Sequence, residues 1–413
     1  MAKDLVILAY SGGLDTSCIL KWLIQQNYDV VCYLADVGQN EHFEKAKLKA
    51  LSIGAKDVIV EDLREEFISN YMFPAIQMGL VYENRYLLGT SLARPCISVG
   101  IVNAAKKLGA KYISHGATGK GNDQVRFELS VYSLWPEGKV IAPWRIPEFF
   151  QRFQGRSDLI EYAKKENIPV SATPKEPWST DENIMHISYE SGVLEDPTAI
   201  PPKGIYNMTR DLLDAVDYPT TIDVDFVKGI PNSIRIPSGQ EKPLVVHGVL
   251  ACVETLNKLA GQHGIGRIDI VENRFLGLKS RGLYETPAGT ILYVGHVDLE
   301  AYCLDREVLR IKKYLQDKMA DFVYNGFWFS PEGNYTRKCL ELSQENVTGT
   351  VTVQLFKGNV SVLSRKSSTS MYNKDLVSMD VAGGFSPEDS TGFININALR
   401  LKEYSHFMTK TKF

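Results

Sequence analysis

The sequence predicts an α/β fold, with a parallel-sheet domain first, an α+β domain after it and a helix at the C-terminus. In the first half, short apolar runs alternate with amphipathic segments, which is typical of parallel strands joined by helices. In the second half, alternating segments flank Lys228-Gly229 and Lys357-Gly358 as two hairpins. At 413 residues the chain exceeds one comfortable core, so more than one domain is expected.

Composition excludes several classes of protein. Hydrophobic content of 44% and charged content of 23% are ordinary for a globular chain, and a net charge of −3 argues against a nucleic-acid binder. No apolar run approaches the roughly 18 residues of a membrane span. We expect no signal peptide, because a strand begins almost at Met1. The six cysteines form no C-x-x-C pair, so we expect reduced thiols in a cytoplasmic protein.

The first element is a short buried strand, Leu5 to Leu8, followed by the turn Ala9-Tyr10-Ser11-Gly12-Gly13-Leu14-Asp15-Thr16-Ser17 and an amphipathic helix. Two glycines without a Cβ let the backbone turn sharply and approach a ligand. The hydroxyls of this turn and the N–H groups of the new helix point into one space, which suits a phosphate. The alternative is a plain turn with a serine cap, but the full pattern is much rarer than such turns.

The turn is neither a Walker A loop nor the G-x-G-x-x-G dinucleotide turn. It resembles the PP-loop of the ATP pyrophosphatases, which bind ATP and release pyrophosphate after attack at the α-phosphate. This resemblance implies a Rossmann-like domain at the N-terminus.

Further strands and helices follow in alternation. The expected strands are Val30 to Ala35, Asp57 to Val60 and Tyr112 to His115, and the expected helices are one through Lys47 ending at Gly54, one from Leu63 to Met78 interrupted near Pro74, and one from Leu92 to Leu108. Ligands of an open parallel sheet bind beyond the carboxyl ends of its strands. We therefore expect three loops to converge there: Ser11 to Ser17, Ala35-Asp36, and the segment from His115 onward.

That third loop runs from Gly116 to Arg126 and contains three glycines followed by charges of both signs. Its amides and Thr118 suit anionic groups, Asp123 suits an ammonium, and Arg126 suits a carboxylate. The alternative is a flexible surface loop with a capping Asn or Asp.

The second half is expected to begin near the proline-rich connection from Pro169 to Pro177, which sets the domains at 1–168, 169–365 and 366–413. Further helices are expected from Pro243 to Leu259, from Pro287 and from Leu304 to Phe322. The alternating strand around Ile268 carries Glu272 on an apolar face, as a satisfied edge residue or a recessed ligand. The basic amphipathic segment from Ile394 to Met408 could bind membrane or RNA, but docking on a neighbouring subunit is favoured.

Seven blocks, in order from residue 9 to about residue 405, resemble the argininosuccinate synthase family. They are AYSGGLDTS, RYLLGTSLARP, SHGATGKGNDQVRFE, HISYE, RIDIVENR, SRGLYETPAGTIL and TGFININALRLKEY. The resemblance implies ATP-dependent condensation of citrulline with aspartate, giving argininosuccinate, AMP and pyrophosphate, in a homotetramer. Asp36 stands where we expect Asn in relatives, which matters little if only the backbone of Ala35 meets adenine.

The resemblance also implies roles for individual residues. ATP would be held by Ala9, Tyr10, Ser11, Gly12, Gly13, Leu14, Asp15, Thr16, Ser17, Ala35, Ser114, His115, Gly116, Ala117, Thr118 and Gly119. Citrulline would be held by Tyr86, Ser91, Asn122, Arg126, Ser179, Ser188, Glu272 and Tyr284, and aspartate by Thr90, Thr118, Asn122 and Asp123. The catalytic residues would be Asp15, Asp123 and Arg126. Mg²⁺ should accompany the triphosphate without a dedicated protein metal cluster.

Four other hypotheses fit less well. An RNA-modifying thiolase with a PP-loop needs cysteine pairs and a basic face, and an amidotransferase-type synthetase needs a glutaminase nucleophile; neither is evident. A Ser-His-Glu hydrolase set between Ser179 and Glu190 lacks a G-x-S-x-G elbow. A non-catalytic nucleotide-binding relative remains as the alternative from another class, although all the motif positions are intact.

Overall fold

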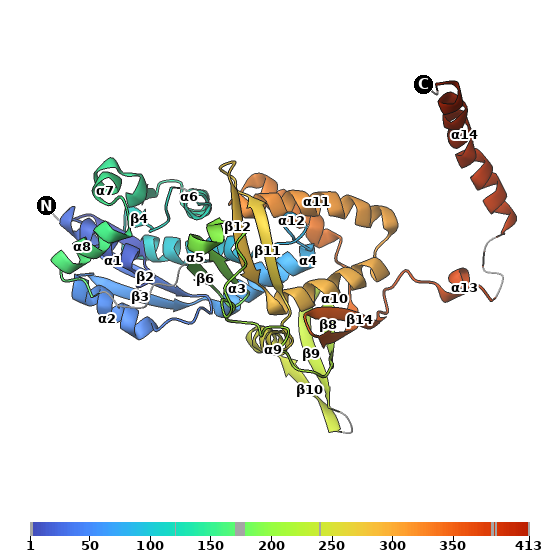
Figure 1. Ribbon diagram of the computed structural model, residues 1–413, viewed down its shortest axis with the longest axis horizontal. Coiled ribbons are helices and arrows are strands. Elements are labelled where there is room, and N and C mark those ends of the chain that lie inside the picture. The colour runs from blue at the N-terminus through green and yellow to red at the C-terminus, as the bar shows by residue number, and fades with distance from the viewer. Residues whose placement is uncertain are drawn as a thin grey trace. The chain divides into compact units, whose positions relative to one another are not determined.

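The computed structural model of the chain describes residues 3–119, 121–169, 178–238, 241–380, 384 and 386–411. The chain divides into two units, Met1–Ser370 and Met371–Phe413. Figure 1 traces the helices and strands of both in colours that follow the sequence. Most of the connection expected at Pro169 to Pro177 lies outside the described residues, and the domain boundaries stay a prediction.

A five-stranded parallel sheet forms from the first 141 residues, in the order β3-β2-β1-β4-β5. Its strands are β1 Leu5–Ala9, β2 Asp29–Asp36, β3 Asp57–Asp62, β4 Tyr112–Ser114 and β5 Lys139–Ile141. The parallel sheet predicted from the alternating segments is confirmed. Because β1 lies between β2 and β4, the loops after these three strands share one edge of the sheet.

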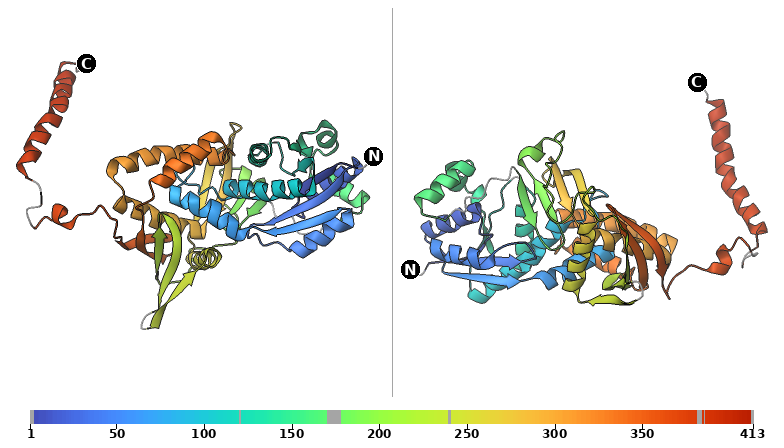
Figure 2. Two further views of the ribbon diagram at one scale, coloured as in Figure 1. Left: turned by 180° about the vertical axis from the view of Figure 1, so that it is seen from behind. Right: turned by 60° about the horizontal axis from the view of Figure 1, so that its bottom comes forward.

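Helices cover both faces of this sheet, which explains the continuous apolar runs of its central strands β1 and β2. Val6 and Leu8 pack on one face against α1 Leu14–Gln25, α2 Phe43–Ile53 and α8 Arg156–Lys165. Ile7 packs on the other face against α5 Gly89–Leu108 and α6 Asp123–Leu134. The short α7, Pro147–Arg152, packs with α8, and Figure 2 shows the arrangement from two further sides.

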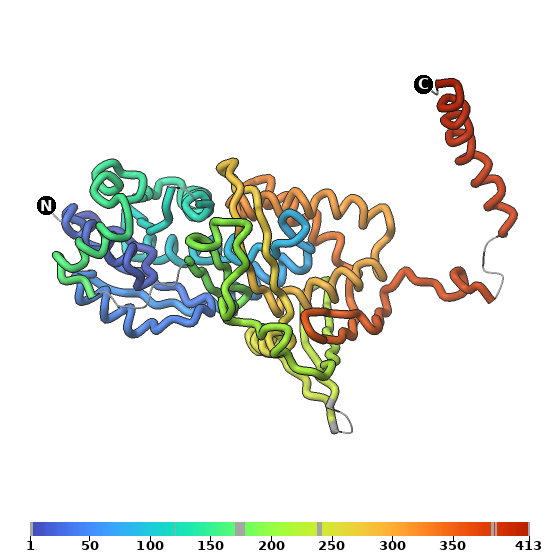
Figure 3. Tube along the Cα trace, viewed as in Figure 1, coloured from blue at the N-terminus to red at the C-terminus, as the bar shows by residue number. Residues whose placement is uncertain are grey.

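The helix expected from Leu63 to Met78 is interrupted, as predicted. It consists of α3 Arg64–Phe67, a π-helical turn Ile68–Met72 and α4 Phe73–Met78. Pro74 has no N–H to donate to the preceding turn, and the wider π turn accommodates that missing bond. The segment packs in the same core as the helices of the second half, and Figure 3 shows its blue trace among the orange helices.

The second half contains two antiparallel sheets. One has the order β11-β12-β7-β6, formed by β6 Ser179–Glu182, β7 Ile187–Glu190, β11 Arg267–Asn273 and β12 Lys279–Glu285. The other has the order β10-β9-β8-β13-β14, formed by β8 Thr220–Val227, β9 Ile230–Ser238, β10 Glu241–His247, β13 Gly349–Phe356 and β14 Asn359–Lys366. Both predicted hairpins are confirmed, since Lys228, Gly229, Lys357 and Gly358 all have positive φ.

The prediction of a helix from Pro243 to Leu259 is wrong for residues 243–248. Residues up to His247 belong to β10, and α9, Val249–Gln262, begins only after Gly248 at φ 87°. The paired Val245 and Val246 favour a strand, and Pro243 is tolerated because β10 lies at the edge of its sheet. The remaining helices are α10 Pro287–Cys303, α11 Arg306–Tyr324 and α12 Pro331–Leu342.

The second unit contains α13 Lys374–Val377 and α14 Glu388–Lys410. The helix expected at Ile394 to Met408 is confirmed and extends in both directions. Its large apolar side chains, Phe393, Ile396 and Leu399 among them, are exposed. In the part of the chain that the structure describes, no helix is long and apolar enough to cross a membrane.

Candidate active site

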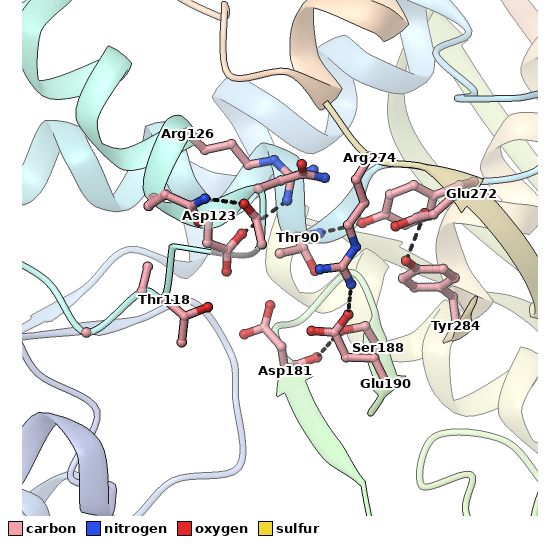
Figure 4. A pocket seen from close by; sticks show the side chains of 16 residues that line it. Thr90, Thr118, Asp123, Arg126, Asp181, Ser188, Glu190, Glu272, Arg274 and Tyr284 are labelled. Carbon is pink, nitrogen blue, oxygen red and sulfur yellow. Dashed lines mark hydrogen bonds and ion pairs between the residues drawn. The ribbon is translucent and has the colours of Figure 1, made fainter. Parts of the chain in front are cut away.

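A cavity of about 240 Å³ lies where the carboxyl edge of the parallel sheet meets the four-stranded antiparallel sheet. Its wall comes from the start of α5, the loop after β4, the start of α6, and strands β6, β7, β11 and β12. Figure 4 shows the side chains of both charge signs that line it. The lining residues are Tyr86, Thr90, Gly116, Ala117, Thr118, Gly121, Asn122, Asp123, Gln124, Arg126, Asp181, Ser188, Glu190, Glu272, Arg274 and Tyr284.

The structure brings most of the amino-acid-binding residues expected from the sequence into this cavity. Two of them are absent from its wall. Ser91 is buried with a hydroxyl that has no partner among the described residues, and Ser179 is exposed on β6. Ser179 pairs in register with Glu190, a lining residue, so it lies beside the cavity.

Asp123 is held between two arginines, of which Arg126 is buried and Arg94 is largely buried. Arg94 Nη2 lies 2.8 Å from Asp123 Oδ2 and 2.7 Å from Asp181 Oδ2, while Arg126 Nη1 lies 3.1 Å from Asp123 Oδ1. Arg126 also donates through Nε to the carbonyl of Tyr324 at 2.9 Å. The result is an alternating set of two cations and two anions at the cavity wall.

These arginines control the ionisation of Asp123. Burial by itself would raise the pKa of this carboxyl, but the guanidinium groups of Arg94 and Arg126 hold it down at about 2. Asp123 is therefore an anion at neutral pH, able to bind a cationic group of a ligand.

Glu272 forms the opposite side of the cavity. It is buried on β11, an edge strand of its sheet, and it lines the cavity, so its role as a ligand residue stays a prediction. The Tyr284 hydroxyl donates to its Oε2 at 3.0 Å, and the Tyr284 ring stacks on Tyr86 with centroids 4.3 Å apart. Burial raises the pKa of Glu272 against the opposing effect of its hydroxyl partners and of Arg126.

Sequence reasoning assigned no role to Arg94 or to several lining residues, namely Gly121, Gln124, Asp181, Glu190 and Arg274. All of these residues except Asp181 lie inside the blocks that carry the resemblance, but the blocks do not show which side chains pair. Arg274 pairs with Glu190, 84 residues away, and Arg94 pairs with Asp181, 87 residues away. Partners that lie so far apart in the chain cannot be recognised from a local sequence pattern.

The turn before α1 presents backbone amides and hydroxyls at the start of that helix. Gly12 has φ 69°, and Gly13 starts α1 with no side-chain cap among the described residues, so the serine-capped turn is not formed. Ser11 and Thr16 hydroxyls lie 3.2 Å apart, and Tyr10 and Ser17 hydroxyls 3.0 Å apart. Helix N–H groups and hydroxyls thus gather at one end of α1.

The glycine loop after β4 connects this turn to the cavity. A Cβ added to Gly116 would lie 2.9 Å from Thr16 Cγ2, so the two loops touch. His115 is buried, and its Nδ1 accepts from the amide of Ala117 at 3.2 Å while Nε2 lies 3.1 Å from Glu128. Its ring therefore supports the loop. Gly119 is exposed, and Ser114 is buried with an unpartnered hydroxyl in the described structure.

Asp15 and Ala35 complete the expected nucleotide residues. Asp15 lies half-buried in the first turn of α1, where burial raises its pKa. Ala35 ends β2, and its carbonyl accepts from Gln39 Nε2 at 2.8 Å. Across the described ranges, no group of three or more His, Cys, Asp or Glu side chains could hold a metal ion.

The fold and the site define an α/β enzyme that combines a glycine turn at a helix N-terminus with a cavity lined by side chains of both charge signs. Comparisons with known proteins agree with that class. Residues 5–169 match the arginosuccinate synthase N-terminal HUP domain, and residues 178–404 match the arginosuccinate synthase C-terminal domain.

Curated relatives match over nearly the whole chain. An argininosuccinate synthase of Anopheles gambiae is 60% identical, covering 98% of this chain and 95% of that protein. One of Drosophila melanogaster is 59% identical, covering 98% of this chain and 97% of that protein. One of Xenopus tropicalis is 57% identical, covering 100% of this chain and 99% of that protein. The chain belongs to the argininosuccinate synthase family.

Proposed function

We propose that the cavity binds citrulline and aspartate, that the Ala9 to Ser17 turn binds ATP, and that the chain thereby makes argininosuccinate. The enzyme is an ATP-dependent carbon–nitrogen ligase, and its products are argininosuccinate, AMP and pyrophosphate. One observation carries the assignment. One cavity next to the N-terminus of α1 is lined by guanidinium groups, Arg126 among them, and by carboxylates that include Asp123 and Glu272.

The chemistry requires two steps. A ureido oxygen is a poor leaving group, so citrulline is first activated when that oxygen attacks the α-phosphorus of ATP and pyrophosphate departs. The aspartate amine then attacks the activated carbon of citrullyl-AMP, and AMP leaves. Both steps depend on placement and charge neutralisation, and neither needs a protein nucleophile.

The turn and the glycine loop supply the groups for ATP. Amides and hydroxyls between Ser11 and Ser17 hold the departing pyrophosphate, Ala35 meets adenine through its backbone, and Ser114 to Gly119 complete the site. Mg²⁺ accompanies the triphosphate through phosphate oxygens and water, which agrees with the oxygen ligands that this ion prefers.

The cavity offers complementary partners for two amino acids. Arg126 binds the citrulline carboxylate as a fork and Glu272 binds its ammonium, with Tyr86, Ser91, Asn122, Ser179, Ser188 and Tyr284 around them. Thr90, Thr118, Asn122 and Asp123 bind aspartate. Asp123 is charged before any substrate arrives, because Arg94 and Arg126 stabilise its anion. Asn122 is shared, which brings the two substrates close together.

The assembly and compartment are also proposals. Exposed apolar side chains on α14, such as Phe393 and Leu399, suit docking on neighbouring subunits of a homotetramer. The six cysteines, all in described positions, are free thiols, which suits the reducing cytoplasm.

Pyrophosphate release from ATP by the purified protein tests the function, with citrulline and aspartate omitted in turn. Release should require citrulline, and argininosuccinate should appear only when aspartate is added. ATP binding without release under any combination would instead favour the non-catalytic relative.

A further inference from the structure

A buried histidine lies directly behind the cavity wall at Thr90. His186 Nε2 is 2.8 Å from Thr90 Oγ1, and the His186 side chain has no exposed surface. Thr90 lines the cavity, where Figure 4 shows it between Asp123 and Arg274. The histidine thus touches a predicted substrate-binding side chain without reaching the cavity itself.

The His186 ring is held from several sides. Its backbone N–H donates to Asn183 Oδ1 at 3.1 Å, and Asn183 Nδ2 donates to the carbonyl of Gly89 at 3.3 Å. The ring packs so closely on Gly89 that an added Cβ there would lie 2.4 Å from His186 Cγ. On another side the ring lies nearly parallel to Tyr284, with centroids 5.9 Å apart.

The surroundings keep this ring neutral. Burial, with the cations Arg94 and Arg126 nearby, lowers the pKa of His186 to about 3. A neutral imidazole carries one proton, on either Nδ1 or Nε2. Nδ1 is buried and has no hydrogen-bond partner in the described part of the chain.

The two tautomers differ in what they leave unpaired. A proton on Nδ1 would be a buried donor without an acceptor, an arrangement that folded proteins avoid strongly. A proton on Nε2 leaves only an unpaired lone pair at Nδ1 and gives a direct bond to Thr90 Oγ1.

We propose that His186 is a positioning residue, which donates its Nε2 proton to Thr90 Oγ1 and so orients the Thr90 hydroxyl as a donor toward the cavity. A threonine hydroxyl has one proton and two lone pairs. When one lone pair accepts from His186, the hydroxyl proton must turn away from the ring. It is then available to an oxygen acceptor of a bound ligand, such as a carboxylate.

This inference rests on the proposed function in one respect: the carboxylate is taken to belong to aspartate. Asp123 and Thr90 then recognise opposite charges of the aspartate zwitterion. Asp123 meets the ammonium, and Thr90 meets a carboxylate oxygen. Because the Thr90 proton points into the cavity, the arrangement favours an acceptor such as a carboxylate oxygen at that point.

Two amide variants of His186 make a matched test. In His186→Gln the side-chain amide nitrogen can occupy the place of Nε2, whereas in His186→Asn the shorter amide reaches only the place of Nδ1. We expect His186→Asn to raise the KM for aspartate at least about tenfold, the scale of one oriented hydrogen bond to a charged group. KM for ATP and for citrulline should stay within about twofold, and His186→Gln should restore most of the loss.

The Thr90→Val variant tests whether the effect passes through the hydroxyl. It should raise the KM for aspartate as His186→Asn does, and the double variant should be no worse than Thr90→Val alone. Additive losses, or equal rises in KM for all three substrates, would overturn the proposal in favour of a merely structural histidine.

Neutron diffraction from deuterated crystals of the wild-type protein reads the proton directly. Deuterium on Nε2 and none on Nδ1 is the expected result, and the opposite tautomer would overturn the proposal. This measurement does not depend on turnover. A wild-type protein that makes no argininosuccinate would therefore refute the proposed function while leaving the position of the proton to be decided.

Discussion

Arg94 Nη2 bridges Asp123 Oδ2 at 2.8 Å and Asp181 Oδ2 at 2.7 Å, with the Arg94 side chain only 13% exposed. Arg94 does not line the cavity, yet it bonds two carboxylates that do. It therefore holds both carboxylates in place from behind the wall and stabilises the Asp123 anion. Removal of either carboxylate would leave a buried cation with less compensation, which costs more than the bond itself.

Replacement of Asp123 should impair aspartate use selectively. In Asp123→Ala the predicted ammonium partner is lost, so the KM for aspartate should rise by about 10- to 100-fold while the Kd for ATP changes little. Steady-state kinetics and ATP titration by calorimetry measure the two quantities. Asp123→Asn is the matched control for shape and should behave like the alanine variant, because the charge is the essential feature. An unchanged aspartate KM in both variants would refute the role.

The Arg126→Lys variant should fail to replace the guanidinium. Arg126 uses Nη1 toward Asp123 and Nε toward the Tyr324 carbonyl, and a lysine ammonium cannot serve both partners and a carboxylate. We expect a rise of about tenfold or more in the KM for citrulline. Near-normal citrulline kinetics would move the carboxylate site elsewhere in the cavity.

Two glycines with the same backbone conformation separate strain from ligand binding. Gly12 and Gly109 have φ 69° and 66°. A Cβ at Gly12 would lie 3.1 Å from Ala46 Cβ, whereas a Cβ at Gly109 would meet nothing within 4 Å. Both alanine variants should lose about 1 kcal/mol of stability from positive φ, with Gly12→Ala losing somewhat more. Only Gly12→Ala should weaken ATP binding, by more than about tenfold.

The measurements for these variants are chemical unfolding and ATP calorimetry. Equal ATP affinity in the two alanine variants would contradict the phosphate-binding role of the turn. A loss of ATP affinity in Gly109→Ala would point to an effect of general destabilisation.

The buried His186 predicts a particular pH dependence of stability. Its folded pKa is lowered to about 3, so below the unfolded pKa of 6.5 the unfolded chain binds a proton that the folded protein does not. Stability from this group is thus complete above pH 6.5 and declines as the pH falls toward 3. Between pH 7 and pH 5, the wild type should lose about 2 kcal/mol more than His186→Gln. Urea unfolding of both proteins measures the difference, and parallel curves would show that the ring accepts a proton in the folded state.

The sequence specified those features that depend on near neighbours. Val6 and Leu8 face one helix layer and Ile7 the other, and such runs are recognisable without tertiary information. The turn at Gly12 and the hairpins at Gly229 and Gly358 follow from the backbone freedom of glycine. The strand at Val245 was mistaken for a helix because its decisive partner, β9, is supplied by the sheet.

What the sequence determined by itself is the order of the elements, the glycine turn before α1 and the motifs that identify the family, because each depends on residues a few positions apart. Only the tertiary structure decided which polar and charged side chains meet. Arg94 reaches Asp181 across 87 residues, and Thr90 reaches His186 across 96. The packing of helices and sheets sets these pairs, and burial then lowers the pKa of the His186 ring below its usual value.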